Sequence, residues 1–465
     1  MSQVQYTARK TLRNYANGGN VLIFATALAL LVVNLPFLHN FYNSLWTHEI
    51  ALQVGGFNLF SHHGHPMSIM AFINDALMAV FFFSIGLEIK REILVGELSS
   101  FRQALLPIVA AIGGMGIPVL IFFILGHGSD YIGGAAIPMA TDIAFSLGIL
   151  SMLGNRVPVS LKIFLSTLAV VDDIGGILVI AIFYSTSINF WMLLAAAVLL
   201  CILALGGKFA IQSKIFYLGI GAFVWFLFLN AGIHPTIAGV LIAFCVPARP
   251  LYAPKKYVKR IRENINHFAH EDDETLNTKT ILNKQQMNWL KEIESASDKV
   301  ISPLQDMEDS LHPVVNYMIV PLFAFANAGI YFGDLEFSAI FKGVSLAIIV
   351  GLVAGKFLGV LGFSWLTVKL GWAPMPDGCN WKQMASVALL AGIGFTVSLF
   401  IADLSFDAGD PILSQLLDNA KLGILIGSLL AGFGGWLALH FTLPKEEKEP
   451  EPDAKVQGTV KQTEK

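Results

Sequence analysis

The sequence predicts an all-α integral membrane protein, and two features of the 465-residue chain carry that prediction. Hydrophobic residues make up 55% of the chain and charged residues only 14%, whereas charged residues make up about 25% of soluble proteins. Apolar segments of about 18–25 residues, long enough to cross a bilayer as helices, follow one another from Asn20 to His440. No small-residue cleavage site follows the first apolar run, so a removed signal peptide is not expected.

About twelve transmembrane helices are expected from this pattern. They cover residues 20–38, 68–87, 104–125, 131–152, 159–184, 190–206, 214–229, 232–247, 312–332, 340–366, 384–403 and 418–440. An even number of spans puts both termini on one side of the membrane. Lys and Arg concentrate in the tails and in alternate loops, whereas loops 39–67 and 404–417 contain neither. The positive-inside rule therefore predicts that both termini are cytoplasmic.

The polar segments divide the chain further. The expected segments are a cytoplasmic tail at 1–19, helices one to eight at 20–248 with an outer loop at 39–67, a charged cytoplasmic loop at 249–311, helices nine to twelve at 312–440 and a charged cytoplasmic tail at 441–465. We interpret the long charged loop as a solvated linker with some helix, with a regulatory role as the alternative.

The outer loop contains a second pattern, at residues 51–60. Two short alternating runs are joined there by Gly55-Gly56, which is typical of a two-residue β-hairpin. A lone hairpin is marginally stable in water, so we expect this one to pair with other structure, such as its twin in a second subunit.

Two of the expected helices, 131–152 and 384–403, contain helix-breaking residues near their middle. Proline removes a backbone donor and clashes with the preceding turn, and glycine destabilises a helix because it lacks a side chain and has greater conformational freedom. Interrupted helices in corresponding places of two halves indicate a secondary transporter with inverted-topology repeats, whose broken helices cross at the bilayer midplane. The residues at these interruptions are Pro138, Thr141, Asp142, Gly392, Gly394 and Thr396.

Ionisable side chains inside apolar segments carry the functional prediction. Asp172 and Asp173 are adjacent in the run 159–184, where each carboxylate costs about 2.5–3.5 kcal/mol on insertion scales. Such residues mark ion pathways and proton relays. Lys356 lies among glycines spaced by four, which let another helix approach closely. We expect one aspartate to pair with Lys356 while the other binds a cation, because neighbouring helical residues point about 100° apart.

The expected ligands also indicate which cation is carried. Carboxylates, a threonine hydroxyl and freed backbone carbonyls suit a small, hard cation such as sodium or lithium. Buried carboxyl groups in general can have pKa values several units above about 3.9, so a proton and a metal ion can compete for one site near neutral pH. Competition combined with alternating access is sufficient for sodium/proton exchange. No cofactor and no nucleic-acid partner is expected.

Two other functional classes are alternatives to a sodium/proton antiporter. A sodium-coupled symporter of an organic anion would need a lined substrate cavity and would not need Lys356 beside the paired aspartates. An intramembrane aspartyl protease would need a Gly-x-Gly-Asp sequence, which the chain does not contain. The chain is therefore not expected to be an enzyme.

Six short strings resemble the NhaA-type family of bacterial sodium/proton antiporters, and the similarity extends over about residues 10–440. The strings are Ala140-Thr-Asp-Ile-Ala-Phe, Leu161-Lys-Ile-Phe-Leu, Val171-Asp-Asp-Ile-Gly, Leu322-Phe-Ala-Phe-Ala-Asn-Ala-Gly, Gly355-Lys-Phe-Leu-Gly and Gly392-Ile-Gly-Phe-Thr. The resemblance implies an electrogenic, pH-regulated antiporter of the inner membrane that exchanges sodium or lithium for protons. It also implies roles in salt tolerance and pH homeostasis.

The resemblance assigns roles to the buried residues. It implies that Asp173 is the principal sodium ligand, with Asp172 beside it and Lys356 as the ion-pair partner. Thr141 and Asp142 would lie where the broken helices cross, and Asp142 and Lys356 would compensate the opposed half-helix dipoles.

The resemblance also implies regulatory and assembly roles. Asp75 would lie in the cytoplasmic funnel, and the hairpin at 51–60 would form a homodimer contact. The residues implied in the pH response are Glu88, Arg91, Glu92, Glu308 and His234. The chain departs from the family pattern in its long loop 249–311 and at Asp309, where a histidine often follows the glutamate. Both differences bear on the pH profile and leave the transport site intact.

Overall fold

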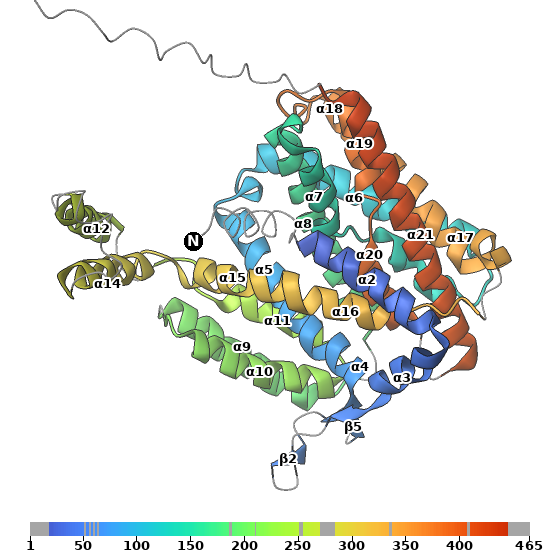
Figure 1. Ribbon diagram of the computed structural model, residues 1–465, viewed down its shortest axis with the longest axis horizontal. Helices are drawn as coiled ribbons and strands as arrows, with labels where there is room; N and C mark the ends of the chain where they lie inside the picture. The colour runs from blue at the N-terminus through green and yellow to red at the C-terminus, as the bar shows by residue number, and fades with distance from the viewer. Residues whose placement is uncertain are drawn as a thin grey trace, which may run out of the picture.

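The computed structural model describes residues 18–50, 53–54, 57–58, 61–62, 65–185, 188–209, 211–250, 254–269, 284–333, 337–406 and 410–444. Its helices confirm the all-α membrane class (Figure 1). Within these residues, eight helices are long and apolar enough to cross a membrane, or ten if each of two bent helix pairs is counted as one span. The expected number of twelve therefore stays a prediction.

The part of the chain before the long charged loop contains most of the spans. Its helices are α2 (Gly18–Asn34), α3 (Pro36–Thr47), α4 (Ile69–Ala71), the π-helical η1 (Phe72–Leu77), α5 (Met78–Leu94), η2 (Glu97–Ser99), α6 (Phe101–Leu125), the 3₁₀-helical η3 (Ile132–Met139), α7 (Ile143–Met152), η4 (Gly154–Arg156), α8 (Val159–Phe183), α9 (Phe190–Lys208), α10 (Lys214–Ala231) and α11 (Pro235–Cys245).

The second part contains the remaining spans and the helices of the charged loop. Its helices are α12 (Pro254–Ala269), α14 (Lys284–Asp298), α15 (Pro303–Val314), the π-helical η5 (Val315–Ile319), α16 (Val320–Asn327), η6 (Phe337–Phe341), α17 (Gly343–Val350), the π-helical η7 (Gly351–Gly355), α18 (Lys356–Lys369), α19 (Trp381–Leu390), α20 (Phe395–Ser405) and α21 (Pro411–Thr442).

Short strands occur in the outer loop. They are β1 (Glu49–Ile50), β2 (Gln53–Val54), β3 (Phe57–Asn58), β4 (Ser61–His62) and β5 (His65–Ser68), and β5 lies between β1 and β4. β2 pairs antiparallel with β3, with Val54 opposite Phe57, which confirms the predicted hairpin pairing. Gly55 and Gly56 lie outside the described residues. β2 projects from one end of the molecule (Figure 1), and its dimer role stays a prediction.

Helices α12 and α14 of the charged loop lie side by side and project away from the membrane helices (Figure 1). They are linked by polar contacts, for example a hydrogen bond from Asn264 Nδ2 to Glu292 Oε2 at 3.2 Å. The loop thus contains helix, in agreement with our interpretation. The helix expected from residue 312 begins earlier, at Pro303, because Ser302 caps α15 by accepting a hydrogen bond from the Gln305 backbone.

Small residues let α18 pack closely on α6, as the glycine spacing predicted. A methyl group added at Gly359 would collide with the backbone of Gly113, and one added at Gly355 would collide with Pro118. Helix backbones approach this closely only where side chains are absent. This packing places Lys356, the first residue of α18, inside the protein rather than toward lipid.

Both predicted helix interruptions are present. The first span changes from η3 to extended backbone after Met139 and resumes as α7 at Ile143. The second is broken between Leu390 and Phe395, and its two halves are bent by 43°. The two interruptions contact each other: the Asp142 backbone NH donates to the Ile393 carbonyl at 2.6 Å. The crossing of two broken helices is thereby confirmed, while the inverted repeat stays a prediction.

Candidate functional site

Asp142 joins the two interrupted helices. Its carboxylate accepts hydrogen bonds from the Phe145 backbone NH at 3.0 Å and from the backbone NH and hydroxyl of Thr396 at 3.1 and 2.6 Å. Its own backbone NH donates to the Ile393 carbonyl at 2.6 Å. One carboxylate thus caps the N-terminal ends of both α7 and α20, where helix dipoles favour negative charge.

Lys356 and Thr141 lie on the other side of the crossing. Lys356 Nζ donates to Thr141 Oγ1 at 2.9 Å, and Thr141 Oγ1 lies 2.8 Å from the carbonyl oxygen of Ala391. That carbonyl belongs to the C-terminal end of the half-helix α19, which carries partial negative charge. The buried ammonium group of Lys356 near this C-terminal end balances the Asp142 carboxylate at the N-terminal ends of α7 and α20. The geometry therefore agrees with charge compensation by Lys356 and Asp142.

The partner of Lys356 is Asp172. Lys356 Nζ lies 2.5 Å from Asp172 Oδ2, which is also 2.6 Å from Thr141 Oγ1. Both side chains of the pair are 0% exposed. The second oxygen, Asp172 Oδ1, has no hydrogen-bond partner within the described residues. Of the two adjacent aspartates, the one committed to the ion pair is therefore the first.

Asp173 faces a cavity instead. The cavity has a volume of about 380 Å³, and its lining includes Asp173, Thr141, Asp142 and Thr396 from the crossing and Glu88, Arg91 and Glu308 from α5 and α15. Within the described part of the chain, no group donates a hydrogen bond to the Asp173 carboxylate. The approximately 100° turn between neighbouring helical residues explains how α8 gives its two aspartates different surroundings.

Three members of an ionic cluster also line this cavity. Arg91 forms ion pairs with Glu308, with Glu92 at 3.0 Å and with Glu88 at 4.0 Å. Three of these residues share one turn of α5, and Glu308 joins them from α15. We refer to these four residues, Glu88, Arg91, Glu92 and Glu308, as the mouth cluster.

Electrostatics distinguish Glu308 within the mouth cluster. It lies on α15 ahead of the expected span 312–332. Burial raises the pKa of its carboxyl group, the positive charge of Arg91 opposes that rise, and the neighbouring Glu88 adds to it. The protonation of Glu308 therefore depends on the arrangement of the other members of the cluster.

Asp75 and His234 lie away from this cavity. Asp75 is in η1, at the other end of the span that carries Glu88, and about 20 Å along a helix separates them. It is not among the residues lining the cavity. Its partner is His234, whose Nε2 lies 3.6 Å from Asp75 Oδ1. The structure therefore separates Asp75 and His234 from the mouth cluster, and the role of Asp75 in a cytoplasmic funnel stays a prediction.

His312 was missed by the sequence reasoning. It lines the cavity together with Asn316, whose amide nitrogen lies 3.0 Å from the ring Nε2. The sequence did contain a signal, since His312 follows Glu308 by four positions on a helix and such residues share a face.

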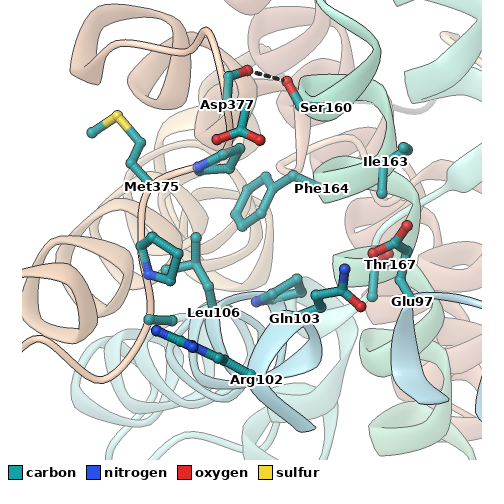
Figure 2. A pocket seen from close by; sticks show the side chains of 14 residues that line it. Glu97, Arg102, Gln103, Leu106, Ser160, Ile163, Phe164, Thr167, Met375 and Asp377 are labelled. Carbon is teal, nitrogen blue, oxygen red and sulfur yellow. Dashed lines mark hydrogen bonds between the residues drawn. The ribbon is translucent and has the colours of Figure 1, made fainter. Parts of the chain in front are cut away.

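A second cavity of about 330 Å³ lies between η2, α6, α8 and the segment 373–377 (Figure 2). It carries the charged residues Glu97, Arg102 and Asp377 and is otherwise mostly apolar. The Ser160 hydroxyl closes one side by donating to the Asp377 backbone oxygen at 2.6 Å. Neither Asp172 nor Asp173 lines this cavity, so it is separate from the paired aspartates.

Comparisons with known proteins match nearly the whole chain. A family model described as Na+/H+ antiporter 1 matches residues 9–439. The Na(+)/H(+) antiporter NhaA of Phocaeicola vulgatus is 53% identical over 447 residues, which cover 95% of this chain and 97% of the relative. The proteins of the same name from Bacteroides fragilis and Sulfurimonas denitrificans are 54% and 42% identical, over 92% and 91% of this chain and 96% and 92% of those relatives.

Proposed function

The chain belongs to the Na+/H+ antiporter 1 family, and from this premise we propose how it exchanges sodium for protons. It is a multi-pass membrane protein, and its bacterial relatives support a location in the inner membrane. The relatives carry antiporter names, so the alternative of a sodium-coupled symporter finds no support. The proposals below concern the site, its regulation and its assembly.

The contrast between the two adjacent aspartates carries the proposal. Asp172 is neutralised by Lys356, whereas Asp173 faces the cavity with no donor from the described residues. A carboxylate in that position binds either a proton or a sodium ion. Asp173 is therefore the exchange site, with Thr141 and Asp142 supplying nearby oxygens at the cavity end. Lithium, which prefers the same oxygen ligands, is a second substrate.

The interrupted helices supply the moving part. Asp142 holds the N-terminal ends of α7 and α20 together, so a change in charge at Asp173 acts on half-helices rather than on continuous spans. Reorientation of these half-helices closes the cavity and opens the site to the opposite face. If more protons than sodium ions move in each cycle, the membrane potential contributes about 2.3 kcal/mol per charge per 100 mV.

The mouth cluster is the proposed pH-responsive element. Glu88, Arg91 and Glu308 line the cavity that Asp173 faces, so ions that enter this cavity meet their charges. The charge on these groups changes with pH, and the balance around Glu308 is sensitive to its neighbours. His234 acts through Asp75 at the other end of the span. We place the mouth cluster and both termini at the cytoplasmic face, and the hairpin at 51–60 in a homodimer contact on the outer face.

The test is sodium-driven proton movement in vesicles or proteoliposomes. Sodium added to native protein should dissipate an imposed pH gradient, and Asp173→Asn should reduce the rate at least about 100-fold, because the amide cannot exchange a proton. Asp377→Asn, which removes an exposed carboxylate in the second cavity, is the matched control and should keep the native rate. Native-like transport by Asp173→Asn would exclude Asp173 as the exchange site.

A further inference from the structure

A buried polar cluster lies at the end of the spans opposite the mouth cluster, near Asp75. The Asn74 amide donates to Asp403 Oδ2 at 2.6 Å, and the Asn327 amide donates to Asn74 Oδ1 at 2.9 Å. Asn74 and Asn327 are 6% and 0% exposed. These residues come from three elements, η1, α16 and α20, so the packing of the whole domain brings them together.

One oxygen of this cluster has no hydrogen-bond partner among the residues that the structure describes. Asn327 Oδ1 is fully buried and receives no hydrogen bond from the described residues, although its amide nitrogen donates to both Asn74 and the Phe323 carbonyl. A buried acceptor left without a partner costs about 1–3 kcal/mol. Such groups are uncommon in native proteins and indicate a water molecule, an ion or a function.

The charges around that oxygen favour a cation. Asp75 follows Asn74 in η1, and the Asn74 amide donates to Asp403 at 2.6 Å, so two carboxylates lie close to this cluster. Two neighbouring carboxylates repel one another, and a positive ion between them removes that repulsion. Together with amide oxygens they form the all-oxygen environment that small, hard cations prefer. Asn74 and Asp75 are consecutive residues of the π-helical η1, and π-helical turns are frequent at functional sites.

Helix α20 connects this cluster to the exchange site. Its first turn carries Thr396, which donates to Asp142, and its last turns carry Asp403, which accepts from Asn74. Between them, the ring of Phe400 packs edge-on against His234 with centroids 5.3 Å apart. About two helical turns, or about 10 Å, separate Thr396 from Asp403.

We propose that Asp403, Asp75, Asn74 and Asn327 form a second cation site, on the side of Asp173 opposite the cavity. A sodium ion released from Asp173 toward the outer face would pause there before it leaves. Movement of α20 during the cycle would change the exchange site and this second site together. The inference rests on the proposed function, since it requires sodium to pass through Asp173.

The decisive experiment measures sodium affinity separately at the two faces. Exchange of radioactive sodium is followed in everted and in right-side-out vesicles, for native protein and for Asp403→Asn. We expect the half-saturating sodium concentration to rise at least fivefold at the face opposite the cavity and to change less than twofold at the cavity face. Asp130→Asn, an exposed carboxylate in the loop between α6 and η3, is the matched control and should change neither.

Other outcomes overturn the inference. An equal rise at both faces would mean that Asp403 only maintains the fold, and no change at either face would mean that it does not meet the ion. If Asp403→Asn fails to reach the membrane, Asp403→Glu keeps the charge and should still raise the outer-face value selectively. Absence of sodium exchange in the native protein would instead contradict the proposed function.

Discussion

Two ion pairs of similar chemistry lie at different depths in this protein. Lys356 and Asp172 are fully buried at the crossing of the broken helices, whereas Arg91 and Glu308 lie partly exposed, 35% and 12%, at the mouth of the cavity. Water and salt reach Arg91 and Glu308 but not Lys356 and Asp172. Only the buried pair therefore bears the full desolvation cost of its two charges. The comparison separates a pair that fixes structure from one that can respond to the solution.

The adjacent aspartates repeat the contrast within one helix. Asp172 has a lysine and a threonine as partners, and Asp173 has the cavity. Neutralising one carboxylate lets the other titrate without a second free charge beside it. Specialised neighbours therefore explain why the membrane tolerates two carboxylates in one span.

The largest effect is expected from breaking the buried pair. Lys356→Met leaves Asp172 without its partner in a site closed to water, and loss of one member of a buried ion pair costs about 3–5 kcal/mol. Thermal unfolding of the purified protein in detergent should show a large fall in the transition temperature, together with loss of sodium/proton exchange.

The double variant Lys356→Met/Asp172→Asn provides the control for that experiment. It removes both charges, so most of the lost stability should return. Equal destabilisation of the single and double variants would show that Lys356 stabilises the fold by packing alone. In that case the difference between the buried and the exposed ion pair could not be attributed to the desolvation of their charges.

A smaller effect is expected at the mouth cluster. Arg91 favours the ionised form of Glu308, so in Arg91→Gln the pKa of that carboxyl should rise further and ionisation should require more alkaline solution. If exchange needs ionised Glu308, the pH profile of Arg91→Gln should shift toward alkaline pH. Charged and titratable groups near Glu308 include Arg91, Glu88, Glu92, Asp309 and His312, and Asp306 lies on the same helix.

The measurement is sodium-driven proton movement between about pH 6.5 and 9, with Glu308→Gln as the companion variant. Because Glu308→Gln cannot titrate, its profile should lose the step assigned to this group and should not shift further when Arg91→Gln is added. An acidic shift in Arg91→Gln would reverse the assumed sign and contradict the role of Glu308.

The sequence predicted those features that depend only on the residue types and their spacing within one helix. Pro138 and the Gly392-Ile393-Gly394 run mark the interruptions, because backbone chemistry alone breaks a helix there. Glu88, Arg91 and Glu92 share a face through their spacing. The position of Asp75 could also have been read in this way, since its distance along the span from Glu88 places it at the opposite end.

Contacts between distant segments could not be predicted in this way. Whether Asp172 or Asp173 meets Lys356 depends on the rotation of α8 relative to α18, and a rotation of about 100° exchanges their surroundings. The hydrogen bond between Asn74 and Asp403 joins residues 329 positions apart and depends on how α20 packs against η1. The spacing of residues within one span contains no information about either arrangement.

The smallest effect is expected at a third ion pair, which is more exposed than the other two. Lys214 Nζ lies 2.8 Å from Asp306 Oδ1, and these side chains are 38% and 49% exposed. Exposed pairs contribute about 0–1 kcal/mol, so Lys214→Met should change the unfolding temperature only slightly and leave the pH profile of exchange unchanged. Asp306 lies on α15 close to Glu308, which makes this a demanding test. A shift of the pH profile in Lys214→Met would mean that α10 positions α15, and that the pH-responsive element extends beyond the mouth cluster.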